Sequence, residues 1–89
     1  MQIVVITGLG VVSPLGSDKD SFWDSLIKGN SGISKVESFD ISLYPRQIAG
    51  EIKDFDPTIC MEKREAKKVD RFTQLGVCAS VQALKDSGL

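Results

Sequence analysis

The stretch that decides the fold is Gln2–Gly16, which reads QIVVITGLGVVSPLG. Its first half holds four consecutive β-branched apolar residues, Ile3 to Ile6, and therefore has no polar face. We expect a strand over residues 2–7 that is buried on both sides, as at the centre of an α/β sheet. A strand of this kind needs one layer of structure above it and one below. The stretch therefore predicts an α/β fold.

The glycines that follow resemble a dinucleotide-binding turn only in part. Gly8 and Gly10 have the right spacing, but Ser13 stands where the fingerprint requires a third small residue. Pro14 then disfavours a helical conformation at Ser13, so no helix N-terminus is placed to meet a pyrophosphate. No Gly-Lys-Ser/Thr follows, which excludes a phosphate loop. We expect no nucleotide cofactor, and we expect the glycines to let the backbone turn and pass close to a neighbouring element.

Length and charge limit the function classes. The 89 residues allow one small domain at most, which would bury only about 60–65% of its unfolded surface. A formal net charge of −1 disfavours general nucleic-acid binding, which usually requires a basic excess. No apolar stretch approaches the ~20 residues of a membrane span, and the N-terminus lacks the features of a signal peptide. We expect no nucleic acid and no membrane as partners.

Cysteine and histidine usage argues against independent catalysis. The only cysteines, Cys60 and Cys78, are too few for a disulfide framework, so we expect two lone thiols in a reducing, cytoplasmic compartment. Histidine, the commonest general base and metal ligand, is absent. Two cysteines without histidine cannot form a usual structural zinc site. We therefore expect no metal and no cofactor, and no enzymatic activity from these 89 residues alone.

Periodicity predicts a first helix over residues 18–28. Ser17 is its candidate N-cap, acidic residues occupy its first turn, and Gly29 follows its end. Apolar residues at helical spacing predict a stripe that faces the core, formed by Phe22, Trp23, Leu26 and Ile27.

The middle of the chain carries weaker signals. Residues 33–46 show little periodicity, whereas residues 47–52 alternate partly and predict a short strand. A turn follows, in which Pro57 suits a first helical position. Asp54 and Asp56 flank this turn, and we interpret them as capping groups rather than catalytic acids.

A second helix is predicted over about 70–87. One of its faces consists mostly of small residues, which permits close approach of a neighbour, and a second face is also apolar. We expect Cys78 to be a small buried core residue and Cys60 to be less buried. The first face comprises Phe72, Leu75, Gly76, Ala79 and Ala83, and the second comprises Val77, Val81 and Leu84.

One charged cluster stands out. Residues 63–71, KREAKKVDR, hold five of the eleven Lys and Arg residues, and we call them the basic segment. In a continuous helix the five basic side chains would fall within an arc of about 140°, away from the acidic neighbours. Two interpretations remain open: a solvated face held by ion pairs, or a docking surface for an acidic partner. Nucleic acid is the weaker partner, because no aromatic residues interleave with the basic ones.

Several blocks in order resemble a known family. The stretch Val4–Gly16 is similar to the N-terminal signature of the β-ketoacyl-[acyl-carrier-protein] synthases, the condensing enzymes of fatty acid synthesis. Further blocks continue the resemblance along the whole chain, which is closest to the type II, chain-elongating synthases. These blocks are Gly29–Ile33, Phe39–Asp40, Ala49–Phe55, Asp70–Gln74 and Ala83–Leu89.

The resemblance implies a larger enzyme. Family members are several times longer, adopt the layered α-β-α-β-α thiolase fold, and are usually homodimers. They elongate an acyl chain by decarboxylative condensation with malonyl-acyl carrier protein. Their nucleophilic cysteine and two histidines lie beyond the matched region, so neither Cys60 nor Cys78 inherits a catalytic role. The resemblance thus implies that residues 1–89 are the N-terminal segment of the synthase N-terminal domain, an incomplete part of a thiolase-like fold.

The resemblance also assigns the basic segment a role. Basic residues in the corresponding segment of type II synthases help dock the acidic acyl carrier protein. The matching pattern, Arg64 to Asp70, carries this role onto Arg64, Lys67 and Lys68, with Lys63 and Arg71 as supporting residues at most. Two alternatives stay open: a non-catalytic carrier-binding module, and a segment of a polyketide-type condensing domain.

Overall fold

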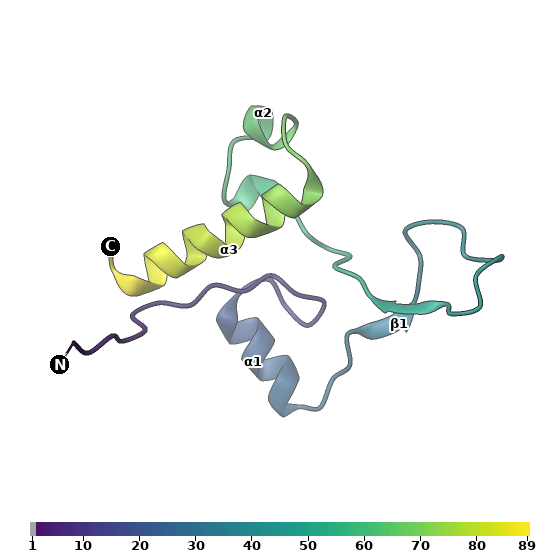
Figure 1. Ribbon diagram of the computed structural model, residues 1–89, viewed down its shortest axis with the longest axis horizontal. Helices are drawn as coiled ribbons and strands as arrows, with labels where there is room; N and C mark the ends of the chain where they lie inside the picture. Colours follow the sequence, from purple (N-terminus) through teal and green to yellow (C-terminus); the bar gives the residue numbers. More distant parts are fainter. Residues whose placement is uncertain (1) are drawn as a thin grey trace.

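The computed structural model describes residues 2–89 (Figure 1). The two short strands form an antiparallel pair in which Ser34 lies opposite Ala49. Helix α3 (Arg71–Ser87) is the longest element of the described residues, and residues 2–16, which we call the N-terminal segment of the chain, run beside its C-terminal half. In chain order the elements are α1 (Lys19–Ile27), β1 (Ile33–Lys35), β2 (Ile48–Gly50), the 3₁₀ helix η1 (Pro57–Ile59), α2 (Lys63–Ala66) and α3 (Arg71–Ser87).

Helix α1 confirms the first predicted helix but corrects its cap. The N-cap is Asp18, whose carboxylate accepts a hydrogen bond from the Ser21 N–H at 2.8 Å, and not Ser17. Gly29 follows the helix with a φ of 74°, a conformation that favours glycine. The expected core stripe is wrong for three of its four residues, because Trp23 is 61% exposed and Leu26 and Ile27 are also exposed. Phe22, its fourth residue, is half-buried.

The expectation of a both-sided core strand over residues 2–7 is also wrong here. These residues form no strand, and their apolar side chains are exposed, with Val4 at 93%. The physical reason is pairing: a strand needs a hydrogen-bonded neighbour, and no other segment of residues 2–89 pairs with this one. The apolar pattern that predicts burial therefore has nothing within the described chain to pack against.

The glycines of the N-terminal segment pass close to a neighbouring element, as the sequence predicts, and the structure shows that this element is α3. A Cβ on Gly10 would overlap the carbonyl oxygen of Ala79, and a Cβ on Gly8 would overlap that of Ala83. Both alanines belong to the small-residue face of α3. The close approach of a glycine backbone to a helix face of small side chains is thus confirmed for this half of the face.

The middle of the chain partly follows the prediction. The expected strand over 47–52 forms as the shorter β2, and its partner β1 lies in a region where the sequence shows little periodicity. Pro57 occupies the first turn of η1, and Asp56 caps it by accepting a hydrogen bond from the Thr58 N–H at 2.9 Å. Asp54 makes no hydrogen bond within the described residues, so its expected capping role does not appear.

Burial is sparse across the described chain. Its buried apolar residues are Ile41, Ala66 and Cys78. The radius of gyration is 15.8 Å, compared with about 12 Å for a compact domain of this length. The accessible surface is 7069 Å², compared with about 5,100 Å² for a compact protein of this mass. The elements are therefore well formed locally but do not enclose a common core.

Candidate functional site

The basic segment is not one continuous helix. Helix α2 ends at Ala66, and Lys67 is its C-cap with helical dihedral angles. Asp70 then adopts an extended conformation (φ −72°, ψ 162°) and serves as the N-cap of α3. The predicted single stripe of five charges is therefore wrong. Four of the charges lie on α2 and the turn that follows it, and the fifth, Arg71, lies at the start of α3.

Ala66 is buried and is hydrogen-bonded to α3, and it therefore connects α2 to the rest of the chain. It is only 6% exposed, and its carbonyl oxygen accepts a hydrogen bond from Gln74 Nε2 at 2.8 Å. Both α2 and α3 pack against η1. The short helix thus gains its stability from tertiary contacts, because four residues are too few to form a helix on their own.

The three predicted docking residues lie together on this turn. We call Arg64, Lys67 and Lys68 the docking trio. Lys67 and Lys68 follow Arg64 by three and four residues, so their side chains are neighbours of the Arg64 side chain on a helical surface. All three are exposed, and none forms an ion pair within residues 2–89. Of the two interpretations left open above, the face held by ion pairs is not observed for this trio. The charges are available to a partner.

Arg71 is engaged elsewhere. Its Nη2 donates a hydrogen bond to the Ile52 carbonyl oxygen at 2.7 Å, and its guanidinium lies 5.3 Å from the centre of the Phe55 ring. This arrangement combines a charge-assisted hydrogen bond with a cation–π contact and holds the segment before η1 against the start of α3. Arg71 therefore has a structural role here, which agrees with its placement outside the docking trio.

The two cysteines are close neighbours beside the basic segment. Cys60, the C-cap of η1, is paired with Cys78 of α3, and their Cα atoms are 5.4 Å apart. This separation lies within the usual range for disulfides. The expectation of two lone thiols is corrected, whereas the buried position predicted for Cys78 is confirmed at 0% exposure. The sequence could not show that the two cysteines lie close together, because 18 residues separate them and only the fold brings η1 against α3.

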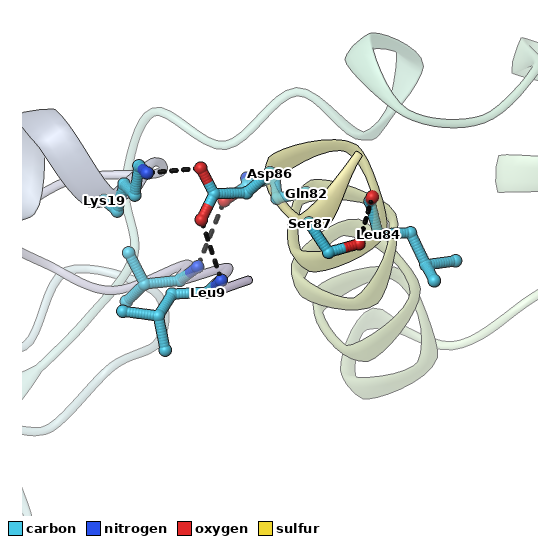
Figure 2. A network of polar contacts seen from close by, with 7 residues as sticks. Leu9, Lys19, Gln82, Leu84, Asp86 and Ser87 are labelled. Carbon is cyan, nitrogen blue, oxygen red and sulfur yellow. Dashed lines mark hydrogen bonds and ion pairs between the residues drawn. The ribbon is translucent and has the colours of Figure 1, made fainter. Parts of the chain in front are cut away.

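A polar network joins the N-terminal segment to α3 (Figure 2). Asp86 pairs with Lys19 and accepts a hydrogen bond from the Leu9 N–H at 3.0 Å. Gln82 accepts from the Val11 N–H at 3.0 Å and donates to the Ser17 carbonyl oxygen. The Lys19 ammonium and the Leu9 N–H hold the pKa of the Asp86 carboxyl below its ordinary value.

Sequence reasoning missed this network. The only available signal is the spacing of Gln82 and Asp86, which are four residues apart and therefore share one face of α3. Polar residues at this spacing are common on exposed helices, so the pattern does not single them out.

An open cleft of about 570 Å³ lies between the turn at residues 13–18 and the segments 31–34 and 51–54. Two of its three acidic side chains are already engaged: Asp18 caps α1, and Glu51 accepts hydrogen bonds from the Glu37 and Ser38 N–H groups. The third, Asp54, makes no hydrogen bond within the described residues. Within residues 2–89 no group of His, Cys, Asp and Glu side chains could hold a metal ion. In the same range, no helix combines the length and apolarity needed to cross a membrane.

Comparisons with known proteins identify the class. A family model described as the N-terminal domain of beta-ketoacyl synthase matches residues 1–89. The chain is 48% identical to a 3-oxoacyl-[acyl-carrier-protein] synthase 2 of Vibrio harveyi over 97% of this chain and 21% of that protein. The corresponding synthases of Coxiella burnetii and Synechocystis are 46% and 43% identical over the same shares. The chain belongs to the β-ketoacyl synthase family.

A solved structure agrees on the fold. The ishigamide ketosynthase/chain length factor matches with a TM-score of 0.85 and 30% identity, over 96% of this chain and 21% of that one. The chain is thus part of a thiolase-like fold, which confirms the predicted α/β class. It spans about a fifth of the length of the relatives that it matches.

Proposed function

We propose that this chain is the N-terminal segment of a fatty-acid-elongating β-ketoacyl-acyl carrier protein synthase. The whole protein would be an acyltransferase that extends acyl groups by decarboxylative condensation with malonyl-acyl carrier protein. The observation that carries the proposal is the family match over residues 1–89, together with 48% identity over 97% of the chain to a synthase of that name. Within it, residues 1–89 would form a segment of the synthase N-terminal domain.

The chain's own contribution would be structural support and carrier docking. The docking trio supplies exposed positive charge that has no ion-pair partner among the described residues, which suits an acidic protein surface. Exposed charges of this kind mainly raise the association rate and orient the encounter. We assign no catalytic residue, cofactor or metal to this chain. A homodimeric, cytoplasmic enzyme is part of the same proposal and follows from the family assignment.

Charge reversal tests the docking role. The double change Lys67→Glu with Lys68→Glu in the full-length protein should weaken binding of the acyl carrier protein on the order of tenfold, because attraction is replaced by repulsion. The loss should shrink at high salt, where exposed charges are screened. Surface plasmon resonance at several salt concentrations, with circular dichroism to check the fold, would measure both effects.

A matched control separates the docking trio from overall charge. Lys35→Glu with Arg46→Glu changes the net charge equally at two other exposed residues, and it should leave carrier binding nearly unchanged. If both pairs of changes weaken carrier binding equally, or if the first pair does not weaken it, the docking trio has no docking role. The family assignment would remain in either case.

A further inference from the structure

The Cys60–Cys78 pair joins two elements on either side of the basic segment. Cys60 ends η1, and Cys78 lies in the middle of α3. Their Cα separation of 5.4 Å allows a bond between the sulfur atoms without backbone movement. The chain between the two cysteines contains all of α2 and the whole docking trio.

The two cysteines differ in access to solvent. Cys78 is fully buried, whereas Cys60 is only partly buried. The Cys60 sulfur also lies 3.4 Å from the Pro57 carbonyl oxygen, which can accept a hydrogen bond from the thiol when the pair is reduced. The same site therefore accommodates both the bonded and the reduced state, and solvent reaches it from the side of Cys60.

We propose that Cys60 and Cys78 form a reversible thiol–disulfide site that restrains the basic segment, with Cys60 as the residue that reacts first. Disulfides in reducing compartments are usually transient and redox-sensing, so this proposal does not require an oxidising location. It concerns the two cysteines themselves, and its main test does not depend on the docking role.

The reaction needs an external oxidant, for which a low-molecular-weight disulfide is the simplest class. The Cys60 thiolate attacks one sulfur of this disulfide, forms a mixed disulfide, and releases the first small thiol. The Cys78 thiol then loses its proton, attacks the Cys60 sulfur, and releases the second small thiol. Two protein thiols are oxidised to one disulfide, and one small disulfide is reduced to two thiols. The thiol in excess drives the same steps backwards.

Peptide mapping tests the site directly. The full-length protein would be equilibrated with mixtures of reduced and oxidised glutathione, quenched with acid, alkylated and digested with trypsin. Cleavage after Lys and Arg places Cys60 in the peptide 54–63 and Cys78 in the peptide 72–85. We expect these two peptides to be recovered linked under oxidising mixtures and separately alkylated under reducing ones. The proposal fails if they remain unlinked in every mixture, or link only after the protein is unfolded.

Single variants test the order of the two steps. In the Cys78→Ala protein, Cys60 should accumulate as a mixed disulfide with glutathione, because no second thiol can displace it. In the Cys60→Ser protein, Cys78 should stay unmodified, because it is buried. Glutathione on Cys78 in the second variant would overturn the assignment of Cys60 as the entry point.

Limited proteolysis tests the restraint. Trypsin sites at Lys67 and Lys68 lie inside the loop that the bond closes. Cleavage at these sites should be several-fold slower in the oxidised protein than in the reduced one, and the Cys60→Ser protein should show no such difference. Equal rates in both states of the parent protein would show that the bond forms without restraining the segment, which contradicts that part of the proposal.

Discussion

Gly10 shows how a single missing side chain determines the packing of α3. Its backbone lies against Ala79 and Ala83, in space that a Cβ would need. Gly76 lies within α3, and apart from the backbone of its own helix no atom of the described residues lies within 4 Å of the position that a Cβ would take. Gly10 thus occupies a position where a larger side chain would collide with α3, whereas Gly76 occupies one where a Cβ would fit. The sequence pattern does not show this difference.

This contrast yields a matched pair of substitutions. Gly10→Ala should lower the unfolding free energy of the full-length protein by about 1–3 kcal/mol, because the two backbones must move apart. Gly76→Ala should raise it by roughly 0.5–1 kcal/mol, because alanine is the better helix former. Urea unfolding measures both. If Gly76→Ala lowered the unfolding free energy as much as Gly10→Ala does, another part of the full-length protein would have to pack against Gly76.

The carboxyl of Asp86 should make the free energy of unfolding depend on pH. Lys19 and the Leu9 N–H lower the pKa of its carboxyl below the ordinary value of 3.8, so the folded state binds the proton less tightly than the unfolded state does. The stabilisation is therefore present above pH 3.8 and is lost as the pH falls through the folded pKa. Asp86→Asn, which lacks the charge, should be less stable than the parent protein at neutral pH.

Urea unfolding of both proteins between pH about 6 and about 3 checks this prediction. The stability difference between them should narrow at the acidic end. Asp20→Asn is the control, because the Asp20 side chain makes no hydrogen bond within the described residues. A difference that stays constant over the whole range would exclude the network around Asp86 as its source.

At the scale of elements, α1 illustrates how a correct helix prediction can still miss the cap. Ser17 and Asp18 are both good N-cap residues, and the sequence cannot rank them. The structure selects Asp18, because its carboxylate reaches the Ser21 N–H while the Ser17 carbonyl oxygen is held by Gln82. Contacts with α3 thus decide where the helix begins.

Removing the cap should have a measurable cost. Asp18→Ala should destabilise the full-length protein by about 1 kcal/mol, whereas Ser17→Ala should change its stability by less than about 0.5 kcal/mol. Thermal unfolding of the two variants would compare them. If Ser17→Ala destabilised the protein more than Asp18→Ala, Ser17 would be the N-cap.

The basic segment also shows that helical periodicity does not determine where a helix begins and ends. Its composition correctly marks an exposed, positively charged region, and the docking trio is exposed as the proposal requires. The single helix drawn through it is wrong, because the extended backbone at Asp70 separates α2 from α3. Helical periodicity describes which side chains would align, but it does not show where the helix is interrupted.

At the scale of the whole molecule, the described residues expose more surface than a compact domain of the same mass. Large apolar side chains are exposed on the N-terminal segment, on α1 and on α3, as at Val4, Trp23 and Phe72. The family relatives, of which the chain spans about a fifth, contain the same segment within a much longer fold.

Heating the isolated 89-residue chain tests this view. We expect a broad transition, or self-association, because too little apolar surface is buried to offset the conformational entropy of folding. Calorimetry together with analytical ultracentrifugation would distinguish these outcomes from a cooperative transition of a monomer. A cooperative monomer would instead favour the alternative of an independent carrier-binding module.

The sequence by itself determined the family, the positions of α1 and α3 and the location of the exposed positive charge, because each depends on local patterns of residue type. Tertiary structure alone decided the Cys60–Cys78 pairing, the network around Gln82 and Asp86, and the interruption of the basic segment. These features depend on which distant segments meet. The core position expected for residues 2–7 is a further case, since burial requires neighbouring strands that the described residues do not supply.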